Sequence, residues 1–308
     1  MASYRRPEQL GRLLRSLAEV KAPPGSFEVV VVDDGSPVGD GVTALLEAAG
    51  AALDIDLRFT RAERNLGKAG ARNAAWRLAR GEWVAFTDDD CRPSPEWLIA
   101  LDAAAGDERA DIVVGRTEPD PGRAHLLDLP FSRSLRVEQL TEYFHTCNIA
   151  YRRSLLERLQ GFDEAFRGAG EDTDLGWRAV EGGAVVAFAG DALVVHDVTT
   201  GTWHDELRDR RRWADCVRVV AKHPGARRLA WKPYVYRRSH VPVLGLVALA
   251  PLGLSPWGRR VAVAGLAGLL LSDLARSRSP VKLQMRLADA MEVGLFVRES
   301  VRQKTLLL

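Results

Sequence analysis

The chain has 308 residues and a formal net charge of +2 at pH 7, from 43 Lys and Arg against 41 Asp and Glu. This length allows one large domain or a catalytic domain with an appendage, and the nearly balanced charge argues against a nucleic-acid partner. The three cysteines are odd in number and widely spaced, which favours free thiols in a reducing compartment. The first six residues have no apolar core, so we predict no secretory signal and a catalytic part that faces the cytosol.

The first 115 residues alternate between helical and extended patterns. Apolar residues at helical spacing predict helices over 7–20, 42–51, 68–80 and 95–105. Apolar and β-branched runs predict strands over 27–32, 55–60, 83–86 and 111–115. Strands that alternate with helices indicate βαβ units, so we predict an α/β fold with a Rossmann-like, doubly wound sheet.

The pattern from 120 to 222 is less regular. It predicts a short helix or loop over 125–136, strands over 146–151, 185–188 and 192–196, and helices over 153–159 and 171–181. A long, strongly charged helix is expected over 203–222. We therefore expect a first domain over 1–222.

The C-terminal part contains two apolar runs, 241–255 and 261–272, with arginines and Trp257 beside them. Each run is shorter than the roughly 20 residues that span a bilayer upright. Arg and Trp at the ends of apolar segments are typical of interfacial anchors. We predict a helical region over 223–308 on the cytoplasmic face of the cell membrane, either peripheral or shallowly inserted. The alternative is a soluble hairpin that covers the core or a second subunit of a homodimer.

Three consecutive carboxylates, Asp88, Asp89 and Asp90, follow the predicted strand 83–86. Ser94 and Pro95 then give a helix-start signal, so the acids lie in a turn at the carboxyl end of a strand. Open α/β sheets bind their ligands at this end. Adjacent carboxylates predict a divalent cation, Mg²⁺ or Mn²⁺, bridged to phosphate oxygens. The alternative is a solvated turn that only caps the next helix.

A second acidic pair, Asp33 and Asp34, ends the predicted strand 27–32 and is followed by Gly35 and Ser36. Two such turns in one βαβ array imply one crevice that receives carboxylates from neighbouring strands. A carboxylate there accepts a hydrogen bond from the imide of a uracil-like base or from a ribose hydroxyl. The alternative is an ordinary Asp-Gly turn.

The helix start at 65–73 carries Asn65, Gly67, Lys68 and Arg72. A glycine lets the backbone approach a ligand closely, and a helix start with two cationic side chains favours an anion. The alternative is an ordinary helix entry. The segment is not a Walker A sequence, because Gly-Lys-Ser/Thr is missing at the required spacing.

A glycine-rich segment leads into Glu171, Asp172 and Asp174 at the start of the predicted helix 171–181. Transfer to a hydroxyl group needs a base within hydrogen-bond reach of the attacking oxygen. Asp172 is the first choice for this base and Glu171 the second, whereas Asp174 is expected to orient the loop. The alternative is a set of helix-capping carboxylates.

Four motifs together resemble those of family-2 glycosyltransferases in order and spacing over residues 4–200. They are Asp33-Asp34-Gly35-Ser36, Asn65-x-Gly67-x-x-x-Ala71-Arg72-Asn73, Asp88-Asp89-Asp90 and Gly170-Glu171-Asp172-x-Asp174-Leu175. The resemblance implies the A-type glycosyltransferase fold, with a mixed sheet that binds a nucleotide-diphosphate sugar. It also implies a metal-dependent transfer of the sugar with inversion.

The resemblance gives each motif residue an expected role. Asp34 contacts the base, Asp89 and Asp90 contact ribose and metal with Asp90 as the metal ligand, and Asp172 is the general base. His196 follows the last predicted strand, where similar enzymes place a His that reaches the metal or the diphosphate; the alternative is a structural His. The residues expected to bind the nucleotide sugar are Tyr4, Asp33, Asp34, Asn65, Gly67, Lys68, Arg72, Asp88 and Asp89, and those expected to bind the metal are Asp90, Asp88 and His196.

The N-terminus departs from the family pattern, which begins with an apolar strand and a Pro-Thr-Tyr-Asn-like turn. Tyr4 to Pro7 resemble the end of that turn, but little precedes them. We therefore expect the first strand to be truncated, and a longer chain to melt higher and to bind nucleotide better.

The partners expected from these patterns are a nucleotide-diphosphate sugar, with UDP favoured, and a lipid-linked or cell-envelope glycan as acceptor. Two other functions stay open. One is a nucleotidyltransferase, although the Gly-rich, Arg-bearing first turn expected there is missing. The other is a non-catalytic protein that binds sugar nucleotides or acts as a membrane scaffold.

Overall fold

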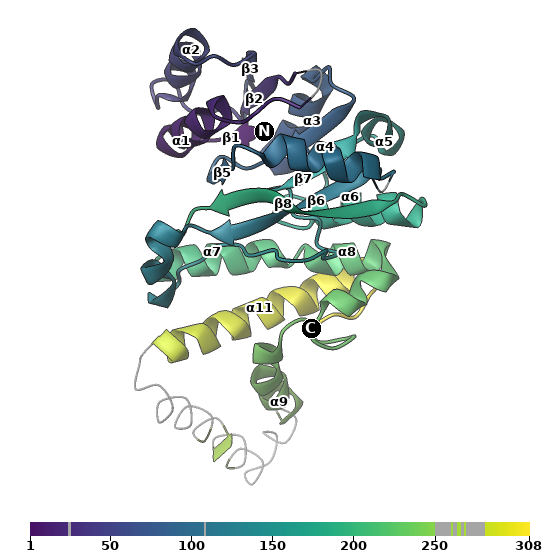
Figure 1. The fold of residues 1–308 in the computed structure, drawn as a ribbon. Helices are drawn as coiled ribbons and strands as arrows, with labels where there is room; N and C mark the ends of the chain where they lie inside the picture. The colour runs from purple at the N-terminus through teal and green to yellow at the C-terminus, as the bar shows by residue number, and fades with distance from the viewer. Residues whose placement is uncertain (24–25, 108, 250–259, 261–263, 266–267, 269–280) are drawn as a thin grey trace. The chain divides into compact units, whose positions relative to one another are not determined.

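The computed structural model describes residues 1–23, 26–107, 109–249, 260, 264–265, 268 and 281–308. The chain divides into two compact units (Figure 1). Unit 1 comprises Met1–Arg167 and Glu171–Thr200, and unit 2 comprises Gly168–Gly170 and Gly201–Leu308. Each unit has an apolar cluster of its own.

The strands of unit 1 form a three-stranded and a five-stranded sheet. The strands are β1 (Ala2–Ser3), β2 (Val29–Asp33), β3 (Leu57–Arg61), β4 (Trp83–Phe86), β5 (Cys91–Pro93), β6 (Ile112–Pro119), β7 (Ile149–Arg152) and β8 (Val186–His196). The smaller sheet is parallel in the order β1-β2-β3. The larger has the order β4-β7-β6-β8-β5, in which only the pair β6–β8 is parallel. This mixed α/β architecture confirms the predicted fold class.

Helices cover both faces of the strands of unit 1. They are α1 (Pro7–Ala18), α2 (Val42–Ala52), α3 (Gly67–Leu78), α4 (Trp97–Asp107), α5 (Arg153–Leu159) and α6 (Glu171–Glu181), with a 3₁₀ helix η1 (Pro121–Asp128). In β2, Val29 and Val31 join the core formed with α1, α2 and α4, whereas Val30 and Val32 pack with α3. A strand buried on both faces explains the continuous valine run that marks β2 in the sequence.

One expectation for the strands of unit 1 is corrected, and one strand was missed. The separate strands 185–188 and 192–196 are one strand, β8, whose irregular register against β6 falls between Gly115 and Arg116. The strand β5 was not predicted at all, because three residues that include Pro93 carry no strand signal. The first strand, expected to be truncated, is the two-residue β1, in which Ala2 and Ser3 pair with Val32 and Asp33.

Unit 2 is helical. It contains α7 (Trp203–Trp213), α8 (Cys216–Lys222), η2 (Pro224–Leu229), η3 (Arg238–His240), α9 (Val241–Leu249) and α11 (Val281–Gln303). The single helix expected over 203–222 is wrong, because the chain breaks between α7 and α8. Asp215 at the start of α8 accepts a hydrogen bond from the Gly168 nitrogen at 2.8 Å.

The predicted apolar hairpin falls largely outside the described residues. The helix α9 covers the first part of the run 241–255, whereas 250–259 and most of 261–272 are not described. Among the described residues, no helix combines the length and apolar character that crossing a membrane requires.

A buried ion cluster joins α7 to α11 within unit 2. The Arg210 guanidinium donates to Glu206 at 2.7 Å and to Asp289 at 2.9 Å, and it also contacts Glu292. The side chains of His240, Asp289 and Glu292 lie close enough to hold a metal ion. However, Arg210 already supplies the positive charge between the two carboxylates, so we assign a structural role to this cluster.

Candidate active site

The acidic turn and His196 meet because of strand register. Asp88, Asp89 and Asp90 follow β4, and β5 then runs antiparallel to β8 with Cys91 opposite His196. The Asp197 nitrogen donates to the Asp90 carbonyl at 2.9 Å. As a result, His196 Nε2 lies 3.7 Å from Asp90 Oδ1.

The environment of His196 selects one tautomer. Its Nδ1 lies 2.9 Å from the Asp197 carbonyl oxygen, which only accepts hydrogen bonds, so Nδ1 carries the hydrogen. Nε2 is the ring nitrogen that faces Asp90 and is left to bind a metal ion. A histidine whose second ring nitrogen is fixed in this way is typical of a metal ligand.

The donor set at this position fits a hard divalent cation. Donor atoms of Asp90, Cys91 and His196 all lie within 4.8 Å of one another. Contact with Cys147 and burial raise the pKa of Cys91 well above its usual range, which disfavours the thiolate that a metal ligand requires. A carboxylate and an imidazole remain, which suits Mg²⁺ or Mn²⁺ with phosphate oxygens better than a thiolate-bound zinc.

Asp88 is held by an arginine of α3. The buried Arg72 of α3 donates from Nη2 to Asp88 at 2.7 Å and from Nη1 to Glu171 of α6 at 2.7 Å. Burial alone would raise the pKa of Asp88, but the positive charges of Arg72 and Lys68 outweigh it and hold this pKa below its ordinary value. Arg72 thus connects the acidic turn to the start of α6.

Asp89 lies between a hydroxyl and a second arginine. Ser3 Oγ donates to Asp89 Oδ2 at 2.9 Å, and Arg6 Nη1 lies 3.1 Å from Asp89 Oδ1. Burial raises the pKa of Asp89 to about 6, although Arg6 opposes the shift. Asp89 therefore still ionises at neutral pH, as a contact to ribose or metal requires.

Asp172 has the properties of a proton acceptor. It begins α6 beside Glu171, and its Oδ1 accepts a hydrogen bond from the Thr173 nitrogen at 2.8 Å. Burial, and next the negative charge of Glu171, raise the pKa of Asp172 to about 7. A carboxylate with this pKa is a much stronger base than an exposed one. Asp174, in contrast, pairs with Arg178 at 2.8 Å within the helix.

The pair at the end of β2 is engaged with the backbone. Asp34 accepts hydrogen bonds from the nitrogens of Leu66 at 2.6 Å and Gly67 at 3.1 Å, so it caps α3. Asp33 accepts from the Ser36 nitrogen at 3.0 Å and closes the turn. These contacts agree with the alternative of a structural turn, and each Asp34 oxygen keeps a lone pair for a ligand.

The remaining predicted residues surround the same helix start. Asn65 Nδ2 donates to the Asp34 carbonyl at 3.2 Å, and Gly67 opens α3 with a positive φ of 78°. Lys68 acts electrostatically on Asp88 and Asp172. Tyr4 is 40% exposed. The structure therefore connects the predicted residues other than Tyr4 through one network in unit 1, which runs from Asp34 through α3 to the acidic turn and α6.

Sequence reasoning missed three residues of this network. Ser3 and Arg6 bind Asp89, and the signal for them was their place at the end of β1 and shortly after it. His145 interacts with Asp88 and His196, and burial lowers its pKa to about 4, so it is neutral at pH 7. No local pattern marked His145.

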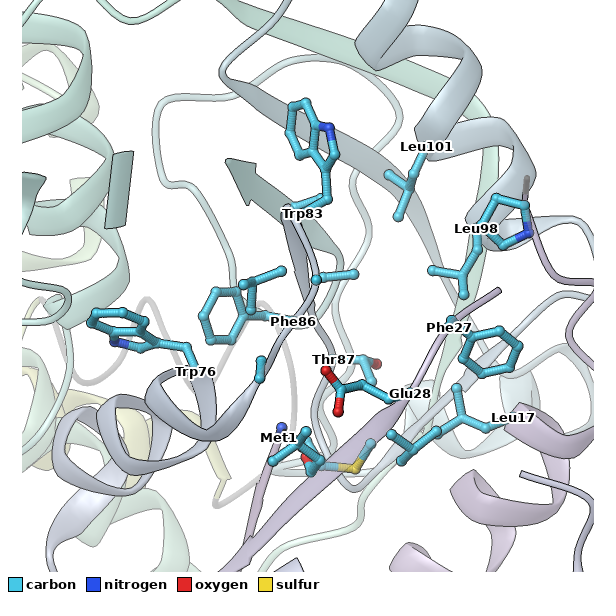
Figure 2. A pocket seen from close by; sticks show the side chains of 18 of the residues that line it. Met1, Leu17, Phe27, Glu28, Trp76, Trp83, Phe86, Thr87, Leu98 and Leu101 are labelled. Atoms are coloured by element: carbon cyan, nitrogen blue, oxygen red, sulfur yellow. Dashed lines mark hydrogen bonds between the residues drawn. The ribbon is translucent and has the colours of Figure 1, made fainter. Parts of the chain in front are cut away.

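A cavity of about 390 Å³ lies elsewhere in unit 1, beside β2 and β4 (Figure 2). Its lining is mainly apolar, with Met1, Phe27, Trp83 and Leu98 among the labelled side chains. Of the carboxylates in its lining, Glu28 and Glu82 are paired with arginines. Among the described residues, its lining includes none of the predicted site residues, so we do not treat it as the active site.

Comparisons with known proteins agree on one family. The model of "Glycosyl transferase family 2" matches residues 1–160, and that of "Glycosyl transferase family group 2" matches residues 83–271. Validoxylamine A glucosyltransferase of Streptomyces hygroscopicus is 28% identical over 72% of this chain and 55% of its own length. Pre-mycofactocin glycosyltransferase of Mycobacterium tuberculosis is 30% identical over 65% of this chain and 41% of its own length. The chain thus spans about half the length of these curated relatives.

Two solved structures share the fold. A mannosyltransferase from Pyrobaculum calidifontis, in complex with GDP-Man and Mn²⁺, has a TM-score of 0.63 and 24% identity over 97% of this chain and 85% of its own. Residues 1–349 of S. aureus TarS, in complex with UDP-GlcNAc, have a TM-score of 0.53 and 22% identity over 99% of this chain and 90% of that one. These likenesses confirm the predicted fold.

Proposed function

Because the chain belongs to glycosyl transferase family 2 and has the expected A-type fold, we propose that it transfers a sugar from a nucleotide-diphosphate donor to a hydroxyl acceptor with inversion. The observation that carries this proposal is the network around Arg72. One buried guanidinium holds both the acidic turn and the helix that bears Asp172, so a cation site and a base lie in the same unit.

The donor side of the site consists of Asp90, His196 and the start of α3. Asp90 and His196 would hold Mg²⁺ or Mn²⁺, and the bound metal supplies Lewis-acid stabilisation of the charge on the leaving diphosphate. Lys68 adds a positive charge on the same side. Asp88 stays on Arg72 and contributes by fixing the turn rather than by ligating.

The acceptor side consists of Asp172. The acceptor oxygen attacks the anomeric carbon while its proton passes to the Asp172 carboxylate. The bond between the anomeric carbon and the phosphate oxygen breaks, and its electron pair leaves with the nucleoside diphosphate. Arg72 keeps Glu171 beside Asp172, and that neighbouring charge helps to raise the pKa of Asp172 to about 7.

The donor class is supported by the bound ligands of the two similar structures, which are GDP-Man with Mn²⁺ and UDP-GlcNAc. We propose a nucleotide-diphosphate sugar as substrate and keep UDP as the first nucleotide to test. The proposed acceptor is a lipid-linked or cell-envelope glycan.

We also propose that unit 2 contacts the cytoplasmic surface of a membrane. One face of α11 is exposed and apolar at a spacing of three and four residues: Leu283, Leu287, Ala290, Gly294, Val297 and Val301. The acidic side chains of α11, Asp289, Glu292 and Glu299, are buried on the other face, whereas Arg298 and Arg302 are exposed. An apolar stripe beside which the exposed charges of the described part of α11 are basic fits an anionic lipid surface. Two copies of this face would instead bring like charges together.

The transfer proposal is tested by incubating the full chain with a panel of nucleotide sugars and Mn²⁺ and by analysing the products. We expect release of a nucleoside diphosphate. Asp172→Asn should lower the rate by about a hundredfold or more, in the range of lost general-base catalysis, and leave nucleotide affinity within about twofold. Asp191→Asn, at an exposed position of β8, is the matched control and should behave as the parent.

The other outcomes would change the mechanism or indicate a rival function. Transfer by Asp172→Asn at close to the parental rate would remove Asp172 from the mechanism. Release of pyrophosphate in place of a nucleoside diphosphate would mean nucleotidyl transfer. Binding of sugar nucleotides without turnover, across the acceptors tested, would favour a non-catalytic binding or scaffold protein.

A further inference from the structure

Arg6 lies between two carboxylates of the acidic turn. It follows β1 and directly precedes Pro7, the first residue of α1. Its Nη1 atom lies 3.1 Å from Asp89 Oδ1 and 3.1 Å from Asp90 Oδ2. One nitrogen therefore neutralises a residue proposed to contact ribose and a residue proposed to bind metal.

The two arginines of the site differ in how firmly they are held. Arg72 has a side chain that is 6% exposed and is fixed by two carboxylates on different elements. The side chain of Arg6 is 49% exposed, so its guanidinium can move into solvent, and the buried Asp89 carboxylate then keeps the Ser3 hydroxyl and gains the charge of the metal. Arg72 is thus a permanent part of the network, and Arg6 is the cation that can be exchanged.

The contacts of Asp90 show what such an exchange would involve. Asp90 Oδ1 faces His196 Nε2 at 3.7 Å, and Asp90 Oδ2 faces Arg6. A divalent ion between Asp90 and His196 would share this carboxylate with Arg6 and would repel the guanidinium across a few ångströms. The Asp90 carboxylate therefore binds the metal ion more weakly while it is paired with Arg6, and Arg6 more weakly while the metal ion is bound.

We propose that Arg6 is an internal counter-cation that competes with the divalent metal for Asp90 and Asp89. Arg6 holds the acidic turn together before the metal binds, and metal binding displaces it. Its charge thereby lowers the affinity of the site for metal. This inference rests on the proposed function, since it takes Asp90 and His196 as the metal site.

The test measures Mn²⁺ binding to the full chain directly, by the electron paramagnetic resonance signal of free Mn²⁺, in the absence of nucleotide. Arg6→Gln should bind Mn²⁺ roughly threefold to tenfold more tightly than the parent, as expected for the loss of a partly exposed competing charge. Arg6→Lys keeps the charge and should stay within about twofold of the parent.

Arg5→Gln is the matched control, because it removes the same charge from the neighbouring residue. Arg5 is exposed, and among the described residues it forms no ion pair; its backbone nitrogen, which the substitution keeps, donates to Ser36 Oγ at 2.9 Å. We expect Arg5→Gln to bind Mn²⁺ as the parent does. An equal gain in Arg5→Gln and Arg6→Gln would mean a general charge effect and would overturn the competition.

The remaining outcomes separate this inference from the proposed function. If the parent binds Mn²⁺ and Arg6→Gln binds it equally or more weakly, the inference is wrong and the metal site stands. If neither binds Mn²⁺, the proposed metal site fails and the inference fails with it. A melting temperature of Arg6→Gln equal to that of the parent verifies that the variant folds. If Arg6→Gln melts at a lower temperature, Arg6→Lys provides the test instead. Mn²⁺ binding by Arg6→Lys more than threefold tighter than by the parent would contradict the competition.

Discussion

Asp172 combines two features that work against the ionised form of a carboxylate, burial and an adjacent acid. Together they raise its pKa to about 7, from an ordinary value of 3.8. A carboxylate with the ordinary pKa would be a weak base toward a hydroxyl group at neutral pH. Arg72 makes the arrangement stable, because its contact with Glu171 compensates the second negative charge next to Asp172.

The pH dependence of transfer follows from this pKa. The base must be unprotonated, so kcat/KM at saturating Mn²⁺ should rise with pH through a midpoint near 7 and then level off. Glu171→Gln removes the second cause of the raised pKa while keeping an acceptor for Arg72. Its midpoint should therefore lie at lower pH. A profile that is flat between pH 5.5 and 8.5 would contradict the assignment of Asp172 as the base.

Among the structural elements, those with a local pattern were predicted well. The predicted strand 83–86 coincides with β4, and the predicted helices 153–159 and 171–181 coincide with α5 and α6. The strand β5 was missed because its existence depends on pairing with β8, about a hundred residues later in the chain. That non-local register also places His196 beside Asp90. The sequence therefore suggested His196 as a site residue but could not show how close it lies to Asp90.

Asp34, at the start of α3, has two proposed roles: it caps the helix and it contacts the nucleotide base. As the residue that caps Leu66 and Gly67, Asp34 should stabilise unit 1, and Asp34→Ala should lower the free energy of unfolding by about 1–2 kcal/mol. Urea denaturation measures this loss, with Asp54→Ala at an exposed position as control. Unchanged stability together with lost nucleotide binding would instead make the base contact the main role of Asp34.

At the scale of the whole molecule, sequence reasoning was informative for unit 1 and much less so for unit 2. In unit 1 the motifs lie at strand ends, and the topology of an α/β sheet brings strand ends together. In unit 2 the decisive contacts join Arg210 of α7 to Asp289 and Glu292 of α11, which are 79 and 82 residues away. Charged residues in a helical pattern normally indicate a solvated face, so neither their burial nor the apolar outer face of α11 could be predicted from the sequence.

The exposed apolar face of α11 gives a prediction for membrane binding by this chain. If this face rests on an anionic membrane, the chain should sediment with phosphatidylglycerol vesicles and much less with phosphatidylcholine vesicles, and high salt should weaken the binding. The double substitution Leu287→Glu and Val301→Glu removes two apolar contacts and adds two negative charges, so we expect it to lower vesicle binding at least about tenfold. Val38→Glu, at a position that is 92% exposed in unit 1, should leave the binding unchanged. If the double variant still binds vesicles but changes from dimer to monomer in solution, a second copy of the chain covers this face and the membrane proposal is wrong.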